Sequence, residues 1–482
     1  MLRLLWQGKK LQKRLINFWR IVWIVTLLIG EWFLFITTMK KCQWEGFYDS
    51  STPEIQRLAI VADPQVTDFY SYKGRNSVLM WFSEKYSDLY MKRSYKHLTN
   101  QLQPDATLFL GDLMDGGREW DDEGFANQVK RFFNIFPENK VNKNIYTTGN
   151  HDIGIRDGIH NDVYLRFQSI FGSTSSIHSL AYNRTLVVLD TVLLTGSNEK
   201  NKPLQKEAWN IVQQVSQLND LQHQHQQQIE KNDSPQSSSL VLFSHVPFYR
   251  PEGTFCGPSR IQSRPSIYQG YGYQYQNLLE SPLSNLLLYH IQPQLIFSGD
   301  DHDFCNITHE YTITINKNQQ QQRQALEYTV PSFSMAQGVR RPGFMLLQPM
   351  QKDDPFLSQL CWLPDQIGIF ISYGILASIT FLSVLIKHLL WYYYRYKRYA
   401  MLENKKLDQK EIDEYFMGME LNNDYDDDHA HGNNNDILPQ HHSKPSLHSL
   451  SFLRTTILPW LYDLKDILII ALPFYIICLL IL

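Results

Sequence analysis

Aspartate, asparagine and histidine residues follow five short apolar segments of the chain, and their side chains suit divalent metal ions. In chain order the clusters are Asp63-Pro64-Gln65, Gly111-Asp112, Gly149-Asn150-His151-Asp152, His245, and Gly299-Asp300-Asp301-His302. Each cluster alone is weak, because Gly-Asp pairs are common in turns and a lone histidine is usually structural. Together and in this order they indicate a two-metal site, in which ions about 3.5–4 Å apart clamp the attacking and leaving oxygens of a phosphoryl displacement.

This ordered pattern resembles the calcineurin-like metallophosphoesterase superfamily, and Asp112 to Asp115 (Asp-Leu-Met-Asp) complete its second motif. The resemblance implies an α/β fold, a metallophosphoesterase β-sandwich flanked by helices. It also implies that one divalent ion is held by Asp63, Gln65, Asp112 and His302, and the other by Asp112, Asn150, His245 and Asp300. His151 matches the family's catalytic histidine, whose implied role is to protonate or stabilise the departing oxygen.

Two of these positions depart from the superfamily pattern. Gln65 stands where a histidine is usual, and Asp300 stands where the last motif usually has its first histidine. An amide oxygen is a weaker ligand than imidazole, whereas a carboxylate is a harder and charged ligand. Oxygen-rich coordination shifts the preference toward Mn²⁺ or Mg²⁺. The alternative is a degenerate site that binds no metal.

Short apolar runs that end in polar loops predict the strands that carry these clusters. The runs are residues 57–65, 106–117, 144–152, 185–192, 239–247 and 293–303. Helices are predicted between them, at residues 83–103, 122–134 and 204–218. Repeated units of strand, polar loop and helix are how α/β proteins place chemistry at the carboxyl ends of a sheet.

Three apolar runs are long enough to cross a bilayer, namely residues 21–38, 366–386 and 461–482. Lys and Arg residues before the first run and after the second place both flanks in the cytoplasm by the positive-inside rule. We therefore expect residues 1–20 to be cytoplasmic and residues 42–350 to form a lumenal domain. A cleaved signal peptide is the alternative for the first run, although no convincing cleavage pattern follows it.

Three segments are predicted to be disordered, because they lack the apolar residues needed to form a core. They are the Gln-rich stretches 222–239 and 317–324 and the cytoplasmic linker 395–455, which is acidic and rich in histidine. Those histidines could bind metal, but a solvated linker is the simpler interpretation. We assign this segment no chemistry.

The central region carries signs of a lumenal domain. Acceptor patterns for N-glycosylation occur at Asn183, Asn232 and Asn306. A lumenal compartment permits a disulfide between Cys256 and Cys305, with two buried thiols as the alternative. The chain of 482 residues has 45 Lys and Arg against 48 Asp and Glu, a net charge of −3, which argues against nucleic acid as a partner.

Four segments narrow the resemblance, namely Asp63-Pro64-Gln65 and residues 111–118 (GDLMDGGR), 299–305 (GDDHDFC) and 328–344 (YTVPSFSMAQGVRRPGF). Beside an N-terminal anchor and C-terminal spans, they look like the membrane-bound phosphoesterases that remodel glycosylphosphatidylinositol (GPI) anchors. This resemblance implies a manganese-dependent phosphodiesterase embedded in the endoplasmic reticulum membrane. Its implied partner is the glycan of a GPI-anchored protein, from a mannose of which ethanolamine phosphate is removed.

Arg118, Arg340 and Arg341 are candidates for contacts with phosphate or glycan, and surface or ion-paired arginines are the alternative. Two other functions stay open on the sequence alone. The enzyme could hydrolyse another lumenal phosphodiester. The chain could instead be a non-catalytic membrane protein that acts in manganese homeostasis, or in cargo sorting with the export machinery.

Overall fold

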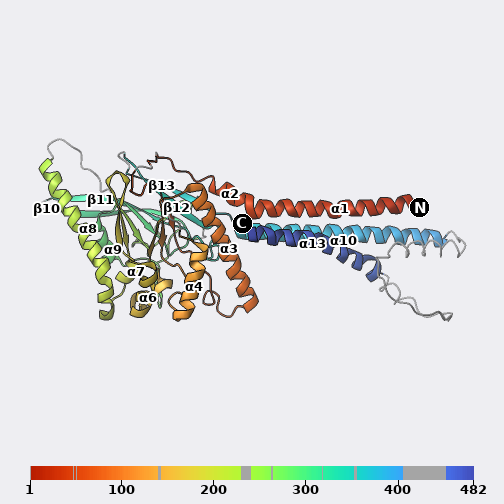
Figure 1. Cartoon of the computed structure of the whole chain (residues 1–482), viewed down its shortest axis with the longest axis horizontal. Coiled ribbons are helices and arrows are strands. Elements are labelled where there is room, and N and C mark those ends of the chain that lie inside the picture. The colour runs from red at the N-terminus through yellow and green to blue at the C-terminus, as the bar shows by residue number, and fades with distance from the viewer. Residues whose placement is uncertain are drawn as a thin grey trace. The chain divides into compact units, whose positions relative to one another are not determined.

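The computed structural model describes residues 2–46, 48–49, 52–138, 143–229, 240–261, 264–316, 319–351, 355–404 and 452–481. The chain divides into two compact units, of which the smaller comprises residues 1–29 and 370–481 and the larger comprises residues 30–369. The smaller unit is helical, whereas the larger unit contains both strands and helices (Figure 1).

Two β-sheets form the centre of the larger unit (Figure 1). The first has the order β13 (Phe356–Trp362), β12 (Gly343–Pro349), β1 (Leu58–Val61), β2 (Ala106–Leu110) and β3 (Lys143–Thr147). The second has the order β10 (Cys305–Asn316), β11 (Gln319–Thr329), β9 (Leu295–Ser298), β6 (Leu240–Ser244), β5 (Arg184–Leu189) and β4 (Ser176–Leu180). Strands β1, β2 and β3 run parallel, as do β5, β6, β9 and β11.

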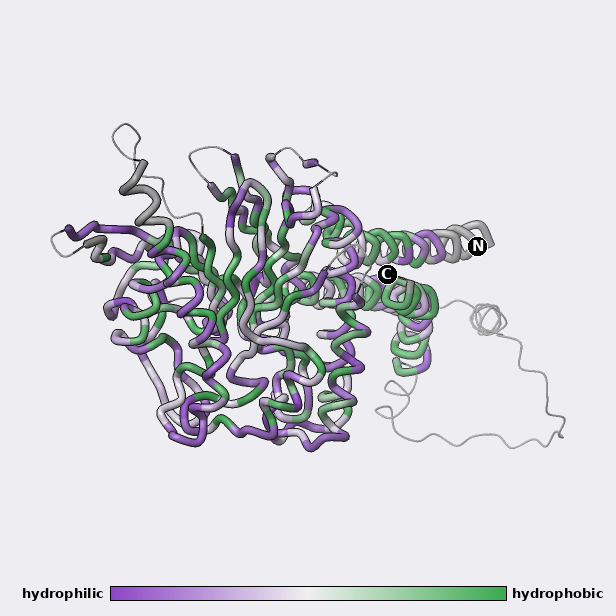
Figure 2. The backbone as a smooth tube through the Cα atoms, turned by 60° about the vertical axis from the view of Figure 1, so that its left-hand side comes forward, coloured by the Kyte–Doolittle hydropathy of each residue, from purple (hydrophilic) through white to green (hydrophobic). Residues whose placement is uncertain are grey.

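The central strands β1, β2 and β6 are buried on both faces of their sheets, and successive side chains along a strand point to opposite faces. Leu58 and Ile60 of β1 belong to an apolar cluster built from strands of both sheets. Ala59 and Val61 belong to a second cluster that also contains residues of the helices. Figure 2 shows hydrophobic strands through the middle of the larger unit. The predicted α/β sandwich flanked by helices is therefore confirmed.

The helices of the larger unit supply the second cluster. They are α2 (Leu34–Met39), α3 (Ser77–Leu102), α4 (Asp122–Ile135), α5 (Asn150–Ile153), α6 (Asn161–Phe171), α7 (Thr191–Leu194), α8 (Lys202–Ile229) and α9 (Ser281–Ile291). The side chains of Asn76 and Asp121 cap α3 and α4 by accepting hydrogen bonds from backbone N–H groups of the first turn. The three predicted helices correspond to α3, α4 and α8. A short hairpin of β7 (Tyr271–Gly272) and β8 (Tyr275–Gln276) completes this unit.

The prediction of disorder for the Gln-rich stretch 317–324 is wrong for residues 319–324, which form a strand. They open β11 and pair antiparallel with β10, for example Gln322 with Thr312. Backbone hydrogen bonds between β10 and β11, rather than apolar burial, order this hairpin. Amino-acid composition alone does not predict such bonds. In the other stretch, residues 222–229 end helix α8, and residues 230–239 lie outside the described residues.

The described residues of the smaller unit form the helices α1 (Leu2–Leu28), most of α10 (Gln366–Asn404) and α13 (Leu458–Ile481), with the π-helical turn η5 (Leu453–Ile457) before α13. Asp463 of α13 pairs with Lys387 and with His388 of α10, at 2.8 Å from His388 Nε2. The linker predicted at 395–455 begins inside α10, which continues to Asn404, and residues 405–451 lie outside the described part of the chain.

Two helices in the described part of the chain are long and apolar enough to cross a membrane. They are Lys13–Met39, which joins α1 to α2 through the π-helical turn η1 (Ile29–Phe33), and Gln366–Arg398. The first two predicted spans fall within these helices. The third, residues 461–482, falls in the region of α13, and its crossing of the membrane stays a prediction.

Two disulfides link distant segments of the larger unit. Cys256 pairs with Cys305, which decides between the two alternatives left open by the sequence. Cys42 pairs with Cys361, a link that no motif in the sequence indicates. Cys305 opens β10 directly after the Asp300–His302 cluster, so the Cys256–Cys305 bond ties that cluster to the loop after β6. Disulfides of this kind persist in oxidising compartments.

We expect loss of the Cys256–Cys305 bond to destabilise the larger unit. The bond closes a loop across a sequence separation of 49, and such a link contributes roughly 2–4 kcal/mol of unfolding free energy. Cys256→Ala, Cys305→Ala and the double variant should therefore lose about the same amount, because either single change already opens the bond. Denaturant unfolding of the detergent-solubilised chain measures this. Additive losses from the two single variants would contradict the pairing.

Candidate active site

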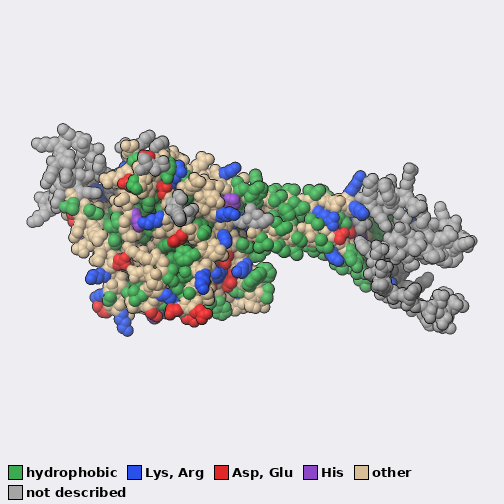
Figure 3. All heavy atoms as spheres, viewed as in Figure 1, with side chains coloured by type: hydrophobic (Ala, Val, Ile, Leu, Met, Phe, Trp, Pro, Cys, Tyr) green, Lys and Arg blue, Asp and Glu red, His purple; other side chains and the backbone are tan. Residues whose placement is uncertain are grey.

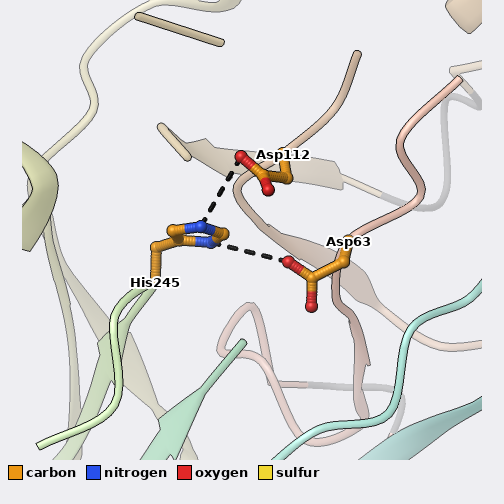
Figure 4. A group of neighbouring side chains, drawn as sticks. All are labelled: Asp63, Asp112 and His245. Atoms are coloured by element: carbon orange, nitrogen blue, oxygen red, sulfur yellow. Dashed lines mark ion pairs between the residues drawn. The ribbon is translucent and has the colours of Figure 1, made fainter. Parts of the chain in front are cut away.

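The five clusters lie directly after β1, β2, β3, β6 and β9, where the carboxyl ends of the parallel strands meet. Asp63, Asp112 and His245 come from three of these strands, and their ligand atoms lie within 4.8 Å of one another. All three side chains are buried, and they point toward one another (Figure 4). The fold thus brings together the residues that the motif pattern selected.

Oxygen atoms surround the imidazole of His245. Its Nδ1 lies 2.7 Å from the Leu110 backbone oxygen and 3.7 Å from Asp63 Oδ1, and its Nε2 is turned toward the oxygens of three other side chains. Asn150 Oδ1 lies 3.2 Å from Nε2, Asp112 Oδ1 lies 3.5 Å away, and Asp300 Oδ1 lies 3.6 Å away. Asn150 Nδ2 donates to the Gln274 backbone oxygen, which fixes its Oδ1 toward the cluster. These atoms face a common point, as the ligands of a cation do.

The buried carboxylates give this point a negative potential. Burial raises the pKa of Asp63 well above its usual value, and the neighbouring Asp112 and Asp300 raise it further. Burial alone would lower the pKa of His245, but Asp112, Asp300 and Asp63 raise it well above its usual value. A field that holds a proton on a buried imidazole also attracts a divalent cation.

Gln65 offers an unsatisfied oxygen on the other side of Asp112. Its Nε2 donates to Asp112 Oδ2 at 2.7 Å, whereas its buried Oε1 has no hydrogen-bond partner among the described residues. Buried acceptors are nearly always paired, so an unpaired one calls for an unseen partner. His302 and Gln65 line the same cleft. The donor set therefore fits a second cation next to the first.

Strained backbone conformations concentrate at these residues. Positive φ angles occur at five of the seven predicted ligands, namely Asp63 (45°), Gln65 (34°), Asp112 (49°), Asp300 (65°) and His302 (66°). Residues other than glycine rarely adopt this region, and strain of this kind gathers at functional sites. Hydrogen bonds hold the strained turns, since Asp300 N donates to Asp63 at 3.1 Å and Gln65 N donates to the Asp112 backbone oxygen at 2.8 Å.

Two glycines allow the loops to approach closely. Gly111 has φ +79°, and a Cβ there would lie 2.6 Å from His245 Nδ1. A Cβ on Gly149 would lie 2.0 Å from Asp112 Oδ1. Any larger residue at Gly111 or Gly149 would therefore collide with the side chains of the cluster.

His151 stands beside the carboxylate cluster at the wall of the cleft. Its backbone N–H donates to Asp112 Oδ1 at 2.8 Å, and its Nδ1 lies 3.0 Å from Asp115 Oδ1. Burial alone would lower the pKa of His151, but Asp112 and Asp115 raise it to about 9. An imidazolium held at Nδ1 leaves Nε2 to donate a proton to a departing oxygen.

Asp152 joins the loops after β2 and β3. Its carboxylate accepts from the backbone N–H groups of Leu113 at 3.0 Å, Met114 at 3.1 Å and Gly149 at 2.9 Å. Asp115 and Asp152 both fall inside the metal-ligand motifs, although the motif pattern assigns neither residue a role of its own. Gln274, which holds Asn150, carries no sequence signal, because it comes from a loop far along the chain.

A cleft of about 290 Å³ opens next to His151 and His302. Arg118 lines it and donates to the Asn150 backbone oxygen at 2.7 Å. Arg340 and Arg341 are not among its lining residues, and Arg340 is an exposed partner of Asp365 at 2.8 Å. The far wall comes from the segment before α3, with Tyr70, Ser71, Tyr72 and Lys73, which no motif had indicated.

The three predicted glycosylation sites differ in their surroundings. Asn183 is exposed in a short turn before β5. Asn306 is half-buried at the start of β10, with its side chain against Gly257. Asn232 lies outside the described residues. Of the two described asparagines, Asn183 has the more accessible side chain.

A buried charged group supports the loops after β6 and β9. Glu327 of β11 accepts from Arg250 at 2.8 Å and lies 2.6 Å from His309 Nε2. Its other oxygen accepts from Ser298 Oγ at 2.6 Å and from the Phe248 backbone N–H at 3.1 Å. Ser298 ends β9 just before Asp300, and Phe248 follows His245, so Glu327 connects both ligand-bearing loops.

Comparisons with known proteins agree with this geometry. The chain matches the family model described as Calcineurin-like phosphoesterase over residues 57–304. It is 35% identical to Cell division control protein 1 of Saccharomyces cerevisiae over 77% of this chain and 75% of that protein. It is 24% identical to Metallophosphoesterase 1 of Mus musculus over 76% of this chain and 87% of that protein. Among solved structures, a dimetal phosphatase from Danio rerio covers 64% of this chain at 15% identity, with a TM-score of 0.36.

Glu327 gives the larger unit a predictable dependence of stability on pH. Burial alone would raise the pKa of Glu327, but Arg250 and His309 lower it to about 2. Its stabilising contribution is therefore complete above about pH 4.5 and is lost as the pH falls toward 2. Glu327→Gln should cost roughly 3–5 kcal/mol at neutral pH, because it leaves Arg250 buried without its partner.

The difference in unfolding free energy between wild type and Glu327→Gln should narrow as the pH falls through that window. Denaturant unfolding followed by tryptophan fluorescence at a series of pH values measures it. Glu310→Gln, on the exposed side of β10, is the matched control and should stay close to wild type throughout. A difference that is constant with pH would contradict the assigned ion pair.

Proposed function

The chain belongs to the calcineurin-like phosphoesterase family, and from that premise we propose that it is a manganese-dependent phosphodiesterase that removes ethanolamine phosphate from a mannose of the GPI glycan. The proposal places the reaction in the lumen of the endoplasmic reticulum. The GPI substrate rests on the resemblance of the motifs at residues 63–65, 111–118, 299–305 and 328–344 to enzymes that remodel GPI anchors.

One observation carries the enzymatic part of the proposal. Asp112, Asn150 and Asp300 direct oxygens at His245 Nε2 from 3.2–3.6 Å, beside the unpaired oxygen of Gln65. We assign one ion to Asp63, Gln65, Asp112 and His302, and the other to Asp112, Asn150, His245 and Asp300. Two such ions, when bound, supply Lewis-acid activation of the nucleophile and of the phosphoryl oxygens.

The residues of the chain then have distinct tasks. Asp112 lies between the two ligand groups, since its Oδ1 faces His245 and its Oδ2 accepts from Gln65. His151 is the proton donor, because Asp115 holds its Nδ1 and its Nε2 can protonate the departing mannose oxygen. Arg118 lines the cleft and is placed to contact phosphate or glycan.

The charge of the ligand set nearly balances two divalent ions. Asp63, Asp112 and Asp300 contribute three negative charges against the four positive charges of the ions. One hydroxide, which hydrolysis requires as the nucleophile, would bring the formal sum to zero. Oxygen-rich ligands also favour Mn²⁺ or Mg²⁺.

The lumenal part of the proposal has independent support. Two apolar helices are compatible with membrane spans, and both disulfides of the larger unit suit an oxidising compartment. GPI glycans face the lumen after attachment to protein. A catalytic unit between the two spans would meet them there.

The test is to load detergent-solubilised wild type and His151→Ala with Mn²⁺ and to assay ethanolamine phosphate release from a GPI glycan. We expect the variant to lose about 10²–10⁴-fold in kcat, because that is the usual contribution of a general acid. Metal content should be equal in the two proteins, since His151 is not among the assigned ligands. His160→Ala, at an exposed histidine of the same unit, is the matched control.

Other outcomes of this assay would support a different substrate, a non-catalytic function or a different metal site. A metallated wild type that cleaves a simple phosphodiester but not the GPI glycan would assign the enzyme another substrate. A metallated wild type that cleaves neither would favour the non-catalytic alternative. A wild type that binds no metal would overturn the two-ion assignment.

Gln65 gives a second test of the ligand assignment. Gln65→His should raise the affinity for the ion on that side, because imidazole is a stronger ligand than an amide oxygen. Gln65→Leu should lower that affinity, since it keeps the approximate volume and removes the oxygen. Titration of the metal-stripped proteins with Mn²⁺, followed by elemental analysis, measures both. Equal affinity in all three proteins would remove Gln65 from the ligand set.

A further inference from the structure

The start of helix α3 carries a group of exposed apolar side chains that the catalytic site does not use. Val78 and Leu79 are each 60% exposed, Trp81 is 53% exposed and Phe82 is 47% exposed. Figure 3 shows hydrophobic side chains gathered over the end of α3 that lies away from α2 in Figure 1. An exposed apolar group of this size marks a surface for interaction.

Charges on the same helix follow a pattern. The exposed charged residues of α3 are Lys85, Lys92 and Lys96, whereas its carboxylates lie on a less exposed side. Asp88, for example, pairs with Arg131 at 2.9 Å. The helix therefore presents apolar side chains at its start and only lysines as exposed charges farther along, a combination found in helices that lie in the interface of a bilayer.

The position of α3 within the larger unit indicates which surface it meets. Arg93 of α3 pairs with Glu31 at 2.8 Å, both buried, and Tyr90 packs against Phe35 with ring centroids 5.7 Å apart. Glu31 and Phe35 belong to the apolar helix Lys13–Met39. This helix has 27 residues, more than the about 20 that cross a bilayer core, and Glu31 and Phe35 belong to its last third, near the far edge of a bilayer that it would span.

The distance along α3 then locates the apolar group. Trp81 lies nine residues before Tyr90, which is about 14 Å of helix. Helix α3 thus passes from a contact with the end of the membrane helix to a cluster of Trp, Phe, Leu and Val. Tryptophan in particular is enriched at the membrane interface.

We propose that the exposed start of α3, comprising Val78, Leu79, Trp81 and Phe82, inserts into the surface of the lipid bilayer. The lysines of the same helix then reach the phosphate groups of the lipid headgroups. The segment between the active-site cleft and this group is short, because Tyr70 to Lys73 line the cleft and α3 begins at Ser77. Insertion consequently holds the mouth of the cleft next to lipid-linked molecules.

Spin labelling of the full chain tests the insertion without reference to catalysis. Leu79→Cys is labelled with a nitroxide and reconstituted in vesicles of phosphatidylcholine and phosphatidylserine. Relaxation by oxygen, which enters the hydrocarbon, is compared with relaxation by a water-soluble nickel chelate supplied on both sides. Leu165→Cys on α6, whose parent residue is 48% exposed, is the control, and the protein without an added cysteine gives the labelling background.

We expect the label at 79 to be relaxed mainly by oxygen and the label at 165 mainly by nickel. Equal, water-like relaxation at both sites would overturn the proposal. So would a label at 79 that neither reagent reaches, since that result would show a covering protein surface rather than lipid.

A kinetic arm rests on the proposed function. Trp81→Ser/Phe82→Ser should reduce hydrolysis of ethanolamine phosphate on a vesicle-embedded mannolipid by roughly fivefold or more, and leave the same diester of methyl mannoside unaffected. An equal loss on both substrates would contradict a role in membrane orientation. If wild type cleaves neither substrate, the proposed function fails, while the spin-label result still decides the insertion.

Discussion

The accumulation of buried carboxylates around one imidazole is the constraint on which the larger unit depends. Asp63, Asp112 and Asp300 lie within 3.5–3.7 Å of the nitrogens of His245. Charges in a dry interior are costly unless a partner compensates them. Burial and the neighbouring Asp112 and Asp300 raise the pKa of Asp63, so keeping this carboxylate ionised at neutral pH works against folding. A bound divalent cation would offset that cost and stabilise the fold.

The larger unit tolerates this cluster of buried carboxylates because contacts from several loops and strands hold it in place. Parallel strands bring five loops to one edge, and Gly111 and Gly149 let those loops approach to a distance that any side chain would block. Asp152 ties the loops after β2 and β3 through backbone N–H groups, and Glu327 ties those after β6 and β9. The strained φ angles of the ligands persist because these bonds over-determine them.

The sequence predicted the parts of this arrangement that repeat a local pattern. Each apolar run with a polar loop became a strand with its cluster, and the order of clusters placed Asp112, Asn150 and His245 in one site. It did not predict Gln274 or the cleft wall at Tyr70–Lys73, because their roles arise from contacts between segments that share no motif. The hairpin of Gln319–Gln324 was missed for a related reason, since its pairing with β10 is a property of the ladder. Arg340 pairs with Asp365, which is the ion-paired alternative that the sequence left open, and its contact with phosphate or glycan stays a prediction.

The ion pair between Glu31 and Arg93 connects the site's scaffold to the apolar N-terminal helix. A carboxylate near the end of a membrane-compatible helix is unfavourable there unless it is neutralised, and Arg93 supplies the opposite charge from α3. The pair is buried, so neither helix can shift without exposing an uncompensated charge. Within the larger unit, one helix therefore connects two features: the middle of α3 pairs with Glu31 through Arg93, and the segment that leads into its first turn lines the cleft.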